Sequence, residues 1–227
     1  MFYLTNRDYA TLILDTGTIL LIAGIMYVCL RHRKKDRPDE DSFLALMIIN
    51  IIIAFGDAMG YTMEEKVLPY TYILSTLGMT IFYIGFCLIS MVWMHYTRVR
   101  FCGAKKIKGK RILYEYLPGI AMIILVLLNV FTGWIFAYDK QVMYHRGVLF
   151  IPLYIVVASY IVAGFVYISK YRNKDIGKQR IHTGVYALPI IFGSVFTFLV
   201  PGSASFAPIG IAMSIVFTHM GTTGEEA

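Results

Sequence analysis

The chain has 227 residues, of which 58% are hydrophobic and only 15% are charged, and its mean hydropathy is +0.65. A soluble domain is about 45–50% apolar and about 25% charged, so this composition excludes a soluble globular protein and indicates an integral membrane protein. The net charge of +7 requires no nucleic-acid partner, because the basic residues gather in a few predicted loops.

Seven apolar segments predict an all-α fold, a bundle of seven transmembrane helices that forms a single domain over 1–227. An α-helix rises about 1.5 Å per residue, so about 20 residues span the hydrocarbon core. The first five segments reach that length, the sixth is slightly short, and the seventh is short enough to predict a helix that continues past residue 227. The segments are 9–30, 43–62, 72–97, 112–137, 148–170, 183–200 and 206–220.

The distribution of basic residues predicts the orientation. If the N-terminus is outside, only Arg7, Lys66, Lys140 and Arg146 among the 21 lysines and arginines lie in outer segments. All the others fall in inner loops or at inner helix ends, as the positive-inside rule requires. We therefore expect an outside N-terminus, a cytoplasmic C-terminus and a location in the plasma membrane, where the inner bases also attract anionic lipid.

Two carboxylates interrupt the first two apolar segments. Asp15 lies about six residues below the predicted outer end of the first helix, and Asp57 lies about five residues, or roughly 8 Å, below that of the second. A carboxylate at a helix centre costs roughly 2.5–3.5 kcal/mol, so an ionisable residue inside the membrane points to a functional site. Three structural alternatives remain open: a backbone cap, a pair with an outer base, or a position that faces a wet vestibule.

Other polar and aromatic residues are expected at similar depth. Together they predict a cup that opens outward and binds a small molecule, since ligand sites between helices combine a few polar groups with aromatic walls. Beside the two aspartates, the predicted contacts are Thr76, Tyr83, Asn129, Trp134 and Tyr154, with Ser75 and Thr197 nearby.

Three histidines offer a different interpretation. His95, His182 and His219 all fall near the inner boundary and could hold zinc, as in membrane hydrolases. No HxxxH or HExxH spacing places two of them on one helical face, so we expect no metal and no cofactor. A second alternative is a small-solute or ion transporter, whose central carboxylates would bind the cargo.

Several motifs resemble the bacterial seven-helix sensor modules that precede GGDEF diguanylate cyclase or histidine kinase domains. The motifs are IFAYDKQVMYHRGVLFIPLY at 135–154, VPGSASFAPIGIAMSI at 200–215, LPG at 117–119 and the acid Asp57. The resemblance covers nearly the whole chain. In that family the seventh helix runs into a cytoplasmic output domain, and we expect one after residue 227.

The resemblance implies a receptor input domain without catalytic activity of its own. An extracellular or membrane-derived small molecule would bind among Asp15, Asp57, Asn129, Tyr154 and the 139–147 loop, and the seventh helix would carry the change inward. The outputs of such modules work as dimers, which implies a homodimer. Arg146 would either bind an anionic ligand or pair with Asp139 of the same loop.

Overall fold

The computed structural model describes residues 4–32, 38–66, 68–102, 110–170, 192–193 and 206–223. Helices α1 to α5 are each long and apolar enough to cross a membrane. The sixth predicted segment, 183–200, lies outside the described residues except for 192–193. The elements are α1 (Asn6–Arg31), α2 (Pro38–Met63), α3 (Thr71–Cys102), α4 (Lys110–Thr132), β1 (Phe136–Tyr138), β2 (Tyr144–Arg146), α5 (Phe150–Lys170) and α8 (Ala207–Thr223).

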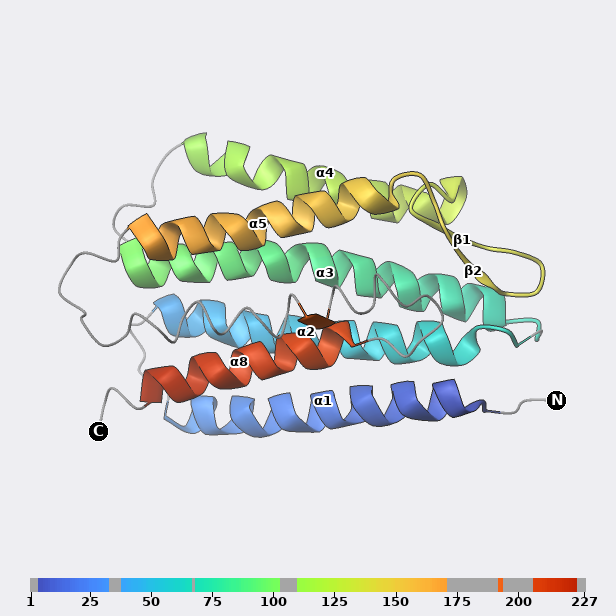
Figure 1. Cartoon of the computed structure of the whole chain (residues 1–227), viewed down its shortest axis with the longest axis horizontal. Coiled ribbons are helices and arrows are strands. Elements are labelled where there is room, and N and C mark those ends of the chain that lie inside the picture. Colours follow the sequence, from blue (N-terminus) through green and yellow to red (C-terminus); the bar gives the residue numbers. More distant parts are fainter. Residues whose placement is uncertain are drawn as a thin grey trace.

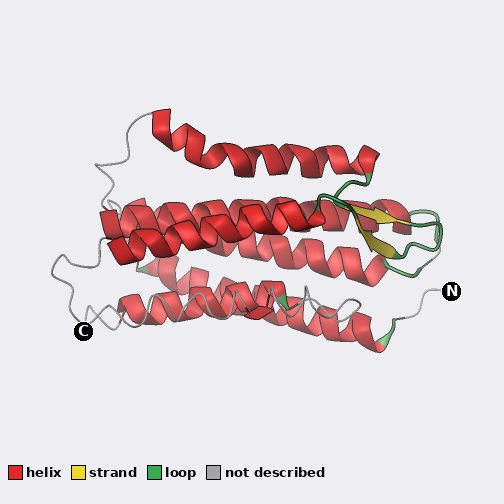
Figure 2. Cartoon of the chain, turned by 45° about the horizontal axis from the view of Figure 1, so that its top comes forward, coloured by secondary structure: helices red, strands yellow, loops and turns green. Residues whose placement is uncertain are grey.

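The helices run side by side along the long axis of the molecule, with α1 and α4 at opposite edges (Figures 1 and 2). The central helix is α3, which packs against α2, α4 and α5. Its most apolar stretch is 72% buried, against 17% for the corresponding stretch of α1. The remaining helix, α8, packs against α1 and α2.

Glycines bring α2 and α3 into close contact, as small residues do between membrane helices. A Cβ atom on Gly78 would lie 2.5 Å from the backbone nitrogen of Gly60 and 2.8 Å from the carbonyl oxygen of Gly56. About two turns further along α3, the side chain of Ile53 fills the space beside Gly85. Larger residues at Gly78 would push the two backbones apart, so this contact fixes the position of α2 on α3.

A tyrosine from α5 repairs an interruption in α4. Pro118 lies inside α4 and has no N–H to donate. Just after it, the Gly119 N–H donates to the Tyr160 hydroxyl at 2.9 Å, and that hydroxyl donates to the carbonyl of Glu115 at 2.9 Å. In a regular helix Gly119 would donate to Glu115 directly, so the hydroxyl stands inside the helical ladder and satisfies both groups.

The fourth predicted segment, 112–137, is helical only as far as Thr132. Gly133 follows with a φ of 63°, a left-handed conformation that ends a helix and suits glycine. The chain then enters β1 at Phe136. The predicted helix ran on to residue 137 because the residues after Gly133 are mostly apolar. Apolar content does not reveal that a single glycine ends the helix.

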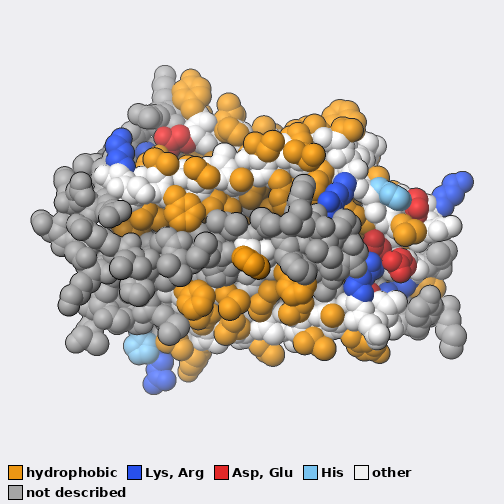
Figure 3. All heavy atoms as spheres, viewed as in Figure 1, with side chains coloured by type: hydrophobic (Ala, Val, Ile, Leu, Met, Phe, Trp, Pro, Cys, Tyr) orange, Lys and Arg blue, Asp and Glu red, His pale blue; other side chains and the backbone are white. Residues whose placement is uncertain are grey.

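The two ends of the bundle differ in their connections. At one end lie the N-terminus, the α2–α3 loop and the hairpin, and at the other lie the C-terminal ends of α1, α3, α5 and α8 (Figure 1). Hydrophobic side chains cover much of the middle of the molecule on the face shown in Figure 3, and many of the visible charged side chains lie toward the ends. The protein is thus a mostly helical, multi-pass membrane protein.

Candidate functional site

The hairpin of β1 and β2 lies at the end of the bundle where α3 begins, near the α2–α3 loop (Figure 1). The strands are antiparallel, with Phe136 opposite Arg146 and Tyr138 opposite Tyr144. Phe136 and Tyr138 are 2% and 9% exposed, so β1 turns its aromatic side chains toward the bundle. The hairpin therefore acts as a cover over the helices, where the sequence predicted an open cup.

Asn129, at the end of α4, holds the start of the hairpin. Its side-chain oxygen accepts from the backbone N–H of Ile135 at 2.6 Å and of Phe136 at 3.3 Å, and its side-chain nitrogen donates to the carbonyl of Phe136 at 2.8 Å. Asn129 is 3% exposed. Both ends of the amide are thus engaged by the backbone, which gives this predicted ligand contact a structural role.

Asp139 organises the turn between the strands. One carboxylate oxygen accepts from the backbone N–H groups of Gln141 at 2.8 Å and Met143 at 3.0 Å, and the other lies 3.2 Å from Nε2 of His145. The hydrogen bond from the Met143 N–H lowers the pKa of Asp139 most, and the hydrogen bond with His145 lowers it further. The guanidinium of Arg146 lies 4.7 Å from the centroid of the Phe150 ring.

The hairpin is fastened to the α2–α3 loop by two hydrogen bonds, which we call the clasp. The Glu65 N–H donates to the carbonyl of Val142 at 3.1 Å, and the Tyr144 N–H donates to a carboxylate oxygen of Glu64 at 2.9 Å. Glu65 and Val142 have φ values of 62° and 60°. Left-handed backbone is rare for a β-branched residue such as valine, so the clasp joins two strained positions.

Ion pairs fasten the start of α1 to the same loop. Arg7 lies 3.1 Å from Glu64 and 3.5 Å from Glu65, and Lys66 donates to Asp8 at 2.7 Å. The Asp8 and Lys66 side chains are 1% and 5% exposed. Removing one partner of a buried pair of this kind destabilises the fold by about 3–5 kcal/mol, because the other charge stays buried and unpaired. The clasp, these ion pairs and the hairpin together form what we call the outer cap, after the orientation that the sequence predicts.

Tyrosines fill the space beneath the outer cap. The hydroxyls of Tyr83 on α3 and Tyr144 on β2 lie 2.6 Å apart. Burial raises the pKa of Tyr144 to about 12, so its hydroxyl keeps its proton at neutral pH and remains a hydrogen-bond donor. Tyr154 of α5 packs its ring against Phe150 at 4.8 Å and Phe86 at 5.4 Å between centroids.

Asp15 and Asp57 meet below the tyrosines, and we call them the acid pair. They are 1% and 0% exposed, and their side chains interact electrostatically with each other across the α1–α2 interface. Asp57 also interacts electrostatically with Tyr61 and Tyr154. Two independent helices thus deliver carboxyl groups to one level of the bundle.

The predicted ligand residues divide into two groups. Asp15, Asp57, Tyr83 and Tyr154 lie in one connected region beneath the outer cap. Arg146 lies on the hairpin and is linked to this region, because its side chain is hydrogen-bonded to Tyr144 and interacts electrostatically with Tyr154. The other three lie elsewhere or are engaged: Asn129 binds the backbone, Thr76 donates to the carbonyl of Tyr72 at 2.8 Å, and Trp134 is 48% exposed.

Sequence reasoning missed the residues that close the site. Glu64 and Lys66 were assigned no role at the site, Tyr144 was included only as part of the 139–147 loop, and Asp8 was not considered. The run EEK at 64–66, directly after an apolar helix, was the available signal, because three charges there can reach the start of α1.

The zinc interpretation of the histidines receives no support from the described residues. Nδ1 of His95 lies 2.9 Å from the Tyr116 hydroxyl. His182 and the side chain of His219 lie outside the described part of the chain. Among the described residues no group of three or more His, Cys, Asp or Glu side chains could hold a metal ion.

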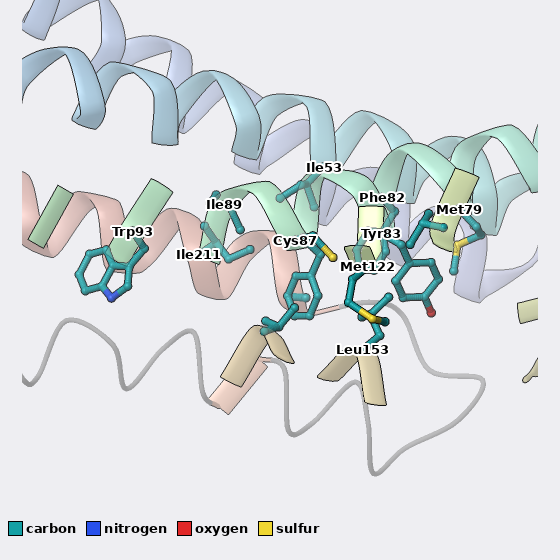
Figure 4. Close-up of a cluster of buried hydrophobic side chains, with 14 of the residues drawn as sticks. Ile53, Met79, Phe82, Tyr83, Cys87, Ile89, Trp93, Met122, Leu153 and Ile211 are labelled. Atoms are coloured by element: carbon teal, nitrogen blue, oxygen red, sulfur yellow. The ribbon is translucent and has the colours of Figure 1, made fainter. Parts of the chain in front are cut away.

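An apolar cavity lies where α8 meets the core. Its walls include Leu46 of α2, Phe86 and Trp93 of α3, and Ile211 and Ser214 of α8. Figure 4 shows Trp93, Ile89 and Ile211 toward one end of the buried cluster and Tyr83 toward the other. The core therefore runs without interruption from the tyrosines under the outer cap to α8.

Comparison with known families identifies one match. The family described as the N-terminal 7TM region of histidine kinase matches residues 14–225, nearly the whole chain. Separate comparisons with curated proteins and with solved structures found no match. The match confirms the resemblance to seven-helix sensor modules and selects the histidine kinase type. This region is the input part of such kinases and is not itself catalytic. The chain therefore belongs to the family of N-terminal 7TM regions of histidine kinases.

Proposed function

We propose that this protein is the sensory input domain of a histidine kinase, which binds an extracellular or membrane-derived small molecule beneath the outer cap. The observation that carries the proposal is the packing of α8 on α1 and α2, the two helices that hold the acid pair. A change at the acid pair can thus reach the last described helix directly, and α8 would carry it to a cytoplasmic signalling domain.

The outer cap is suited to two states. Its clasp joins two left-handed, non-glycine residues, and strain of this kind costs of order 1–3 kcal/mol per residue. Opening the clasp would release that strain and expose the tyrosines, at the expense of the hydrogen bonds from Glu65 and Tyr144. A ligand shifts such an equilibrium only by its difference in affinity for the two states, so we propose that it binds the open cap better.

The arrangement in the membrane completes the proposal. We propose seven helices, an outside N-terminus with the outer cap facing the exterior, and a cytoplasmic end formed by the C-terminal ends of α1, α3, α5 and α8. The positive-inside distribution of lysine and arginine supports this orientation. We also propose a homodimer in the plasma membrane, since kinase output domains act in pairs.

The test joins residues 1–227 to a histidine kinase catalytic region and measures autophosphorylation in membrane vesicles. Glu64→Gln weakens the clasp, Asp57→Asn alters the acid pair, and Lys140→Gln is a control at an exposed hairpin position. We expect the first two to change basal output several-fold and the control to leave it unchanged. Unchanged output from correctly inserted Glu64→Gln and Asp57→Asn proteins would contradict the proposal.

Solute uptake into liposomes that contain the purified chain alone distinguishes a transporter from a sensor. A sensor moves no net solute without a partner, whereas a transporter accumulates its cargo. Uptake of radiolabelled Na⁺ or of an organic amine that is lost in Asp57→Asn would favour transport over sensing.

A further inference from the structure

The two aspartates of the acid pair are joined by a hydrogen bond between their side chains. A carboxylate accepts hydrogen bonds but has none to donate, so a bond between two carboxyl groups requires a proton on at least one of them. Asp15 and Asp57 are each 1% exposed or less, and two buried carboxyl groups in contact seldom ionise together. The acid pair is therefore built around a shared proton.

Tyrosines are the titratable groups that face the acid pair. Besides Asp15, the groups that interact electrostatically with Asp57 are Tyr61 of α2, Tyr138 of β1 and Tyr154 of α5. Tyr83 of α3 interacts in turn with Tyr61 and Tyr154, and the described side chains of α8 include no acid or base. Tyrosines keep their protons at neutral pH, so none of these groups supplies a charge that would replace the shared proton.

The bases of the outer cap have partners of their own. Arg7 pairs with Glu64, and Lys66 pairs with Asp8. Arg146 is linked to the tyrosines by a hydrogen bond with one of them. The charge of the acid pair is thus set by its own protons and not by an ion pair with a neighbouring base.

Polar groups connect the outer cap with the acid pair along the buried face of α1. On this face Asp8, Thr11 and Asp15 follow one another at intervals of three and four residues, or about 4.5 and 6 Å along the axis. Within the described part of the chain, one carboxylate oxygen of Asp8 and the hydroxyl of Thr11 have no hydrogen-bond partner, although both residues are 1% exposed or less. Buried waters bind oxygens of this kind, and one water with two hydrogen bonds spans about 5.5 Å. Single waters between these neighbours would therefore link the outer cap to the acid pair.

The opposite side of the acid pair becomes apolar. On the described parts of α1 and α2, Thr18 and Asn50 are the innermost residues with a buried side-chain polar atom that has no hydrogen-bond partner. Ile22 and Met47 lie further toward the other end of the bundle, and both are 0% exposed and belong to the hydrophobic core. Polar groups thus link the acid pair to the outer cap, and apolar side chains separate it from the opposite end.

We propose that the acid pair is a proton-binding site reached from the outer cap, through which the domain responds to the pH outside the membrane. When the shared proton leaves for the outer water, the hydrogen bond between the carboxyl groups breaks and two like charges face each other. Their repulsion separates α1 from α2, and α8, which packs on both helices, changes its position with them. For its role in sensing, this inference rests on the proposed function.

The first experiment measures proton binding directly, with residues 1–227 in lipid nanodiscs. Infrared spectroscopy follows the carbonyl stretch of protonated carboxyl groups as pH is varied, and subtraction of the double variant Asp15→Asn with Asp57→Asn isolates the acid pair. We expect a carbonyl band at neutral pH that the double variant lacks. The pair should lose its two protons in steps at least about two pH units apart, because the first charge opposes the second. Asp15→Asn should leave one step, and Glu64→Gln should keep both.

The second experiment tests access from outside, with the kinase fusion in inside-out membrane vesicles. The lumen of these vesicles corresponds to the exterior, so luminal pH is varied while the bath, which supplies ATP, is held at one pH. We expect autophosphorylation to change several-fold with luminal pH in the wild type and in Glu64→Gln. Asp15→Asn and Asp57→Asn should each remove this dependence.

Three outcomes would overturn the proton site: no carbonyl band at neutral pH beyond that of the double variant, two steps retained in Asp15→Asn, or a luminal pH response lost in Glu64→Gln but kept in Asp15→Asn. The infrared measurement needs no output domain, so its failure is separable from that of the proposed function. The expected titration in nanodiscs, without any effect of luminal pH on the fusion, would leave the proton site in place and overturn its sensory role.

Discussion

The two faces of α2 are built in opposite ways. Toward α3, the glycines Gly56, Gly60 and Gly78 bring the backbones together. Toward α1, the contact is made across buried polar side chains, among them the acid pair, Thr11 and Thr18. A close glycine contact has one good arrangement, whereas a contact between two buried carboxyl groups changes in energy with the charge of the pair. The α3 face therefore holds α2 in place, and the α1 face is suited to respond to a signal.

The largest effect on stability is expected for Lys66→Met in the outer cap, which tests how firmly α1 is held at its start. The change leaves Asp8 buried without its cation, and we expect a loss of about 3–5 kcal/mol in the free energy of unfolding, measured by denaturant titration in detergent. The double variant Asp8→Leu with Lys66→Met should recover most of that loss. A loss below about 1 kcal/mol, like that of the exposed control Lys140→Met, would show that the pair does not hold α1.

The next test compares two glycines. Gly78→Ala places a methyl group 2.5 Å from the Gly60 nitrogen, so we expect a loss of about 1–3 kcal/mol from forced separation of α2 and α3. The matched control is Gly24→Ala on α1, where the new Cβ has nothing within 4 Å. Equal stability of the two variants would contradict the view that the glycine contact fixes α2.

A third test addresses the α1 face directly. Asp15→Leu removes one of two buried carboxyl groups that repel each other when both are charged, so we expect the unfolding free energy to stay equal or rise by about 1 kcal/mol. Destabilisation by more than about 2 kcal/mol would instead assign Asp15 a structural role.

The smallest expected effect is a pH dependence of the outer cap. Burial raises the pKa of Glu64, and the bond from the Tyr144 N–H and the charge of Arg7 offset this only in part. In the closed cap Glu64 then keeps a proton that it loses in the opened cap, so closure weakens as pH rises from the ordinary glutamate range through the raised pKa. The effect is about 1.4 kcal/mol for each unit of pKa difference.

Hydrogen exchange of the hairpin amides measures this dependence, after correction for the intrinsic effect of pH on exchange. Protection should fall as pH rises through that window, and Glu64→Gln should remove the dependence. Protection that rises with pH would mean that the ionised carboxylate and its pair with Arg7 dominate.

Some features could be predicted from residues alone. That Asp15 and Asp57 lie at a common level followed from counting residues along two apolar runs, because helical rise is constant and the membrane sets the length of a span. The family followed from short motifs such as LPG at 117–119. Asn129 and Trp134 could not be placed in the same way, because a polar or aromatic residue near a helix end serves a turn, a surface or a site equally well. Only the path of the chain after Gly133 decides among these roles.

The sequence by itself determined that this protein spans a membrane, where its long apolar helices begin and end to within about five residues, and that two carboxylates lie at a similar level along their helices. These properties depend on local composition and on a helical rise that does not vary. Only the tertiary structure decided that the carboxylates face each other, that a hairpin closes over them, and that Lys66 pairs with Asp8. Each of these joins residues distant in the chain, and the rotation of one helix against another is set by packing, such as the contact of Gly78 with Gly60, which no single segment encodes.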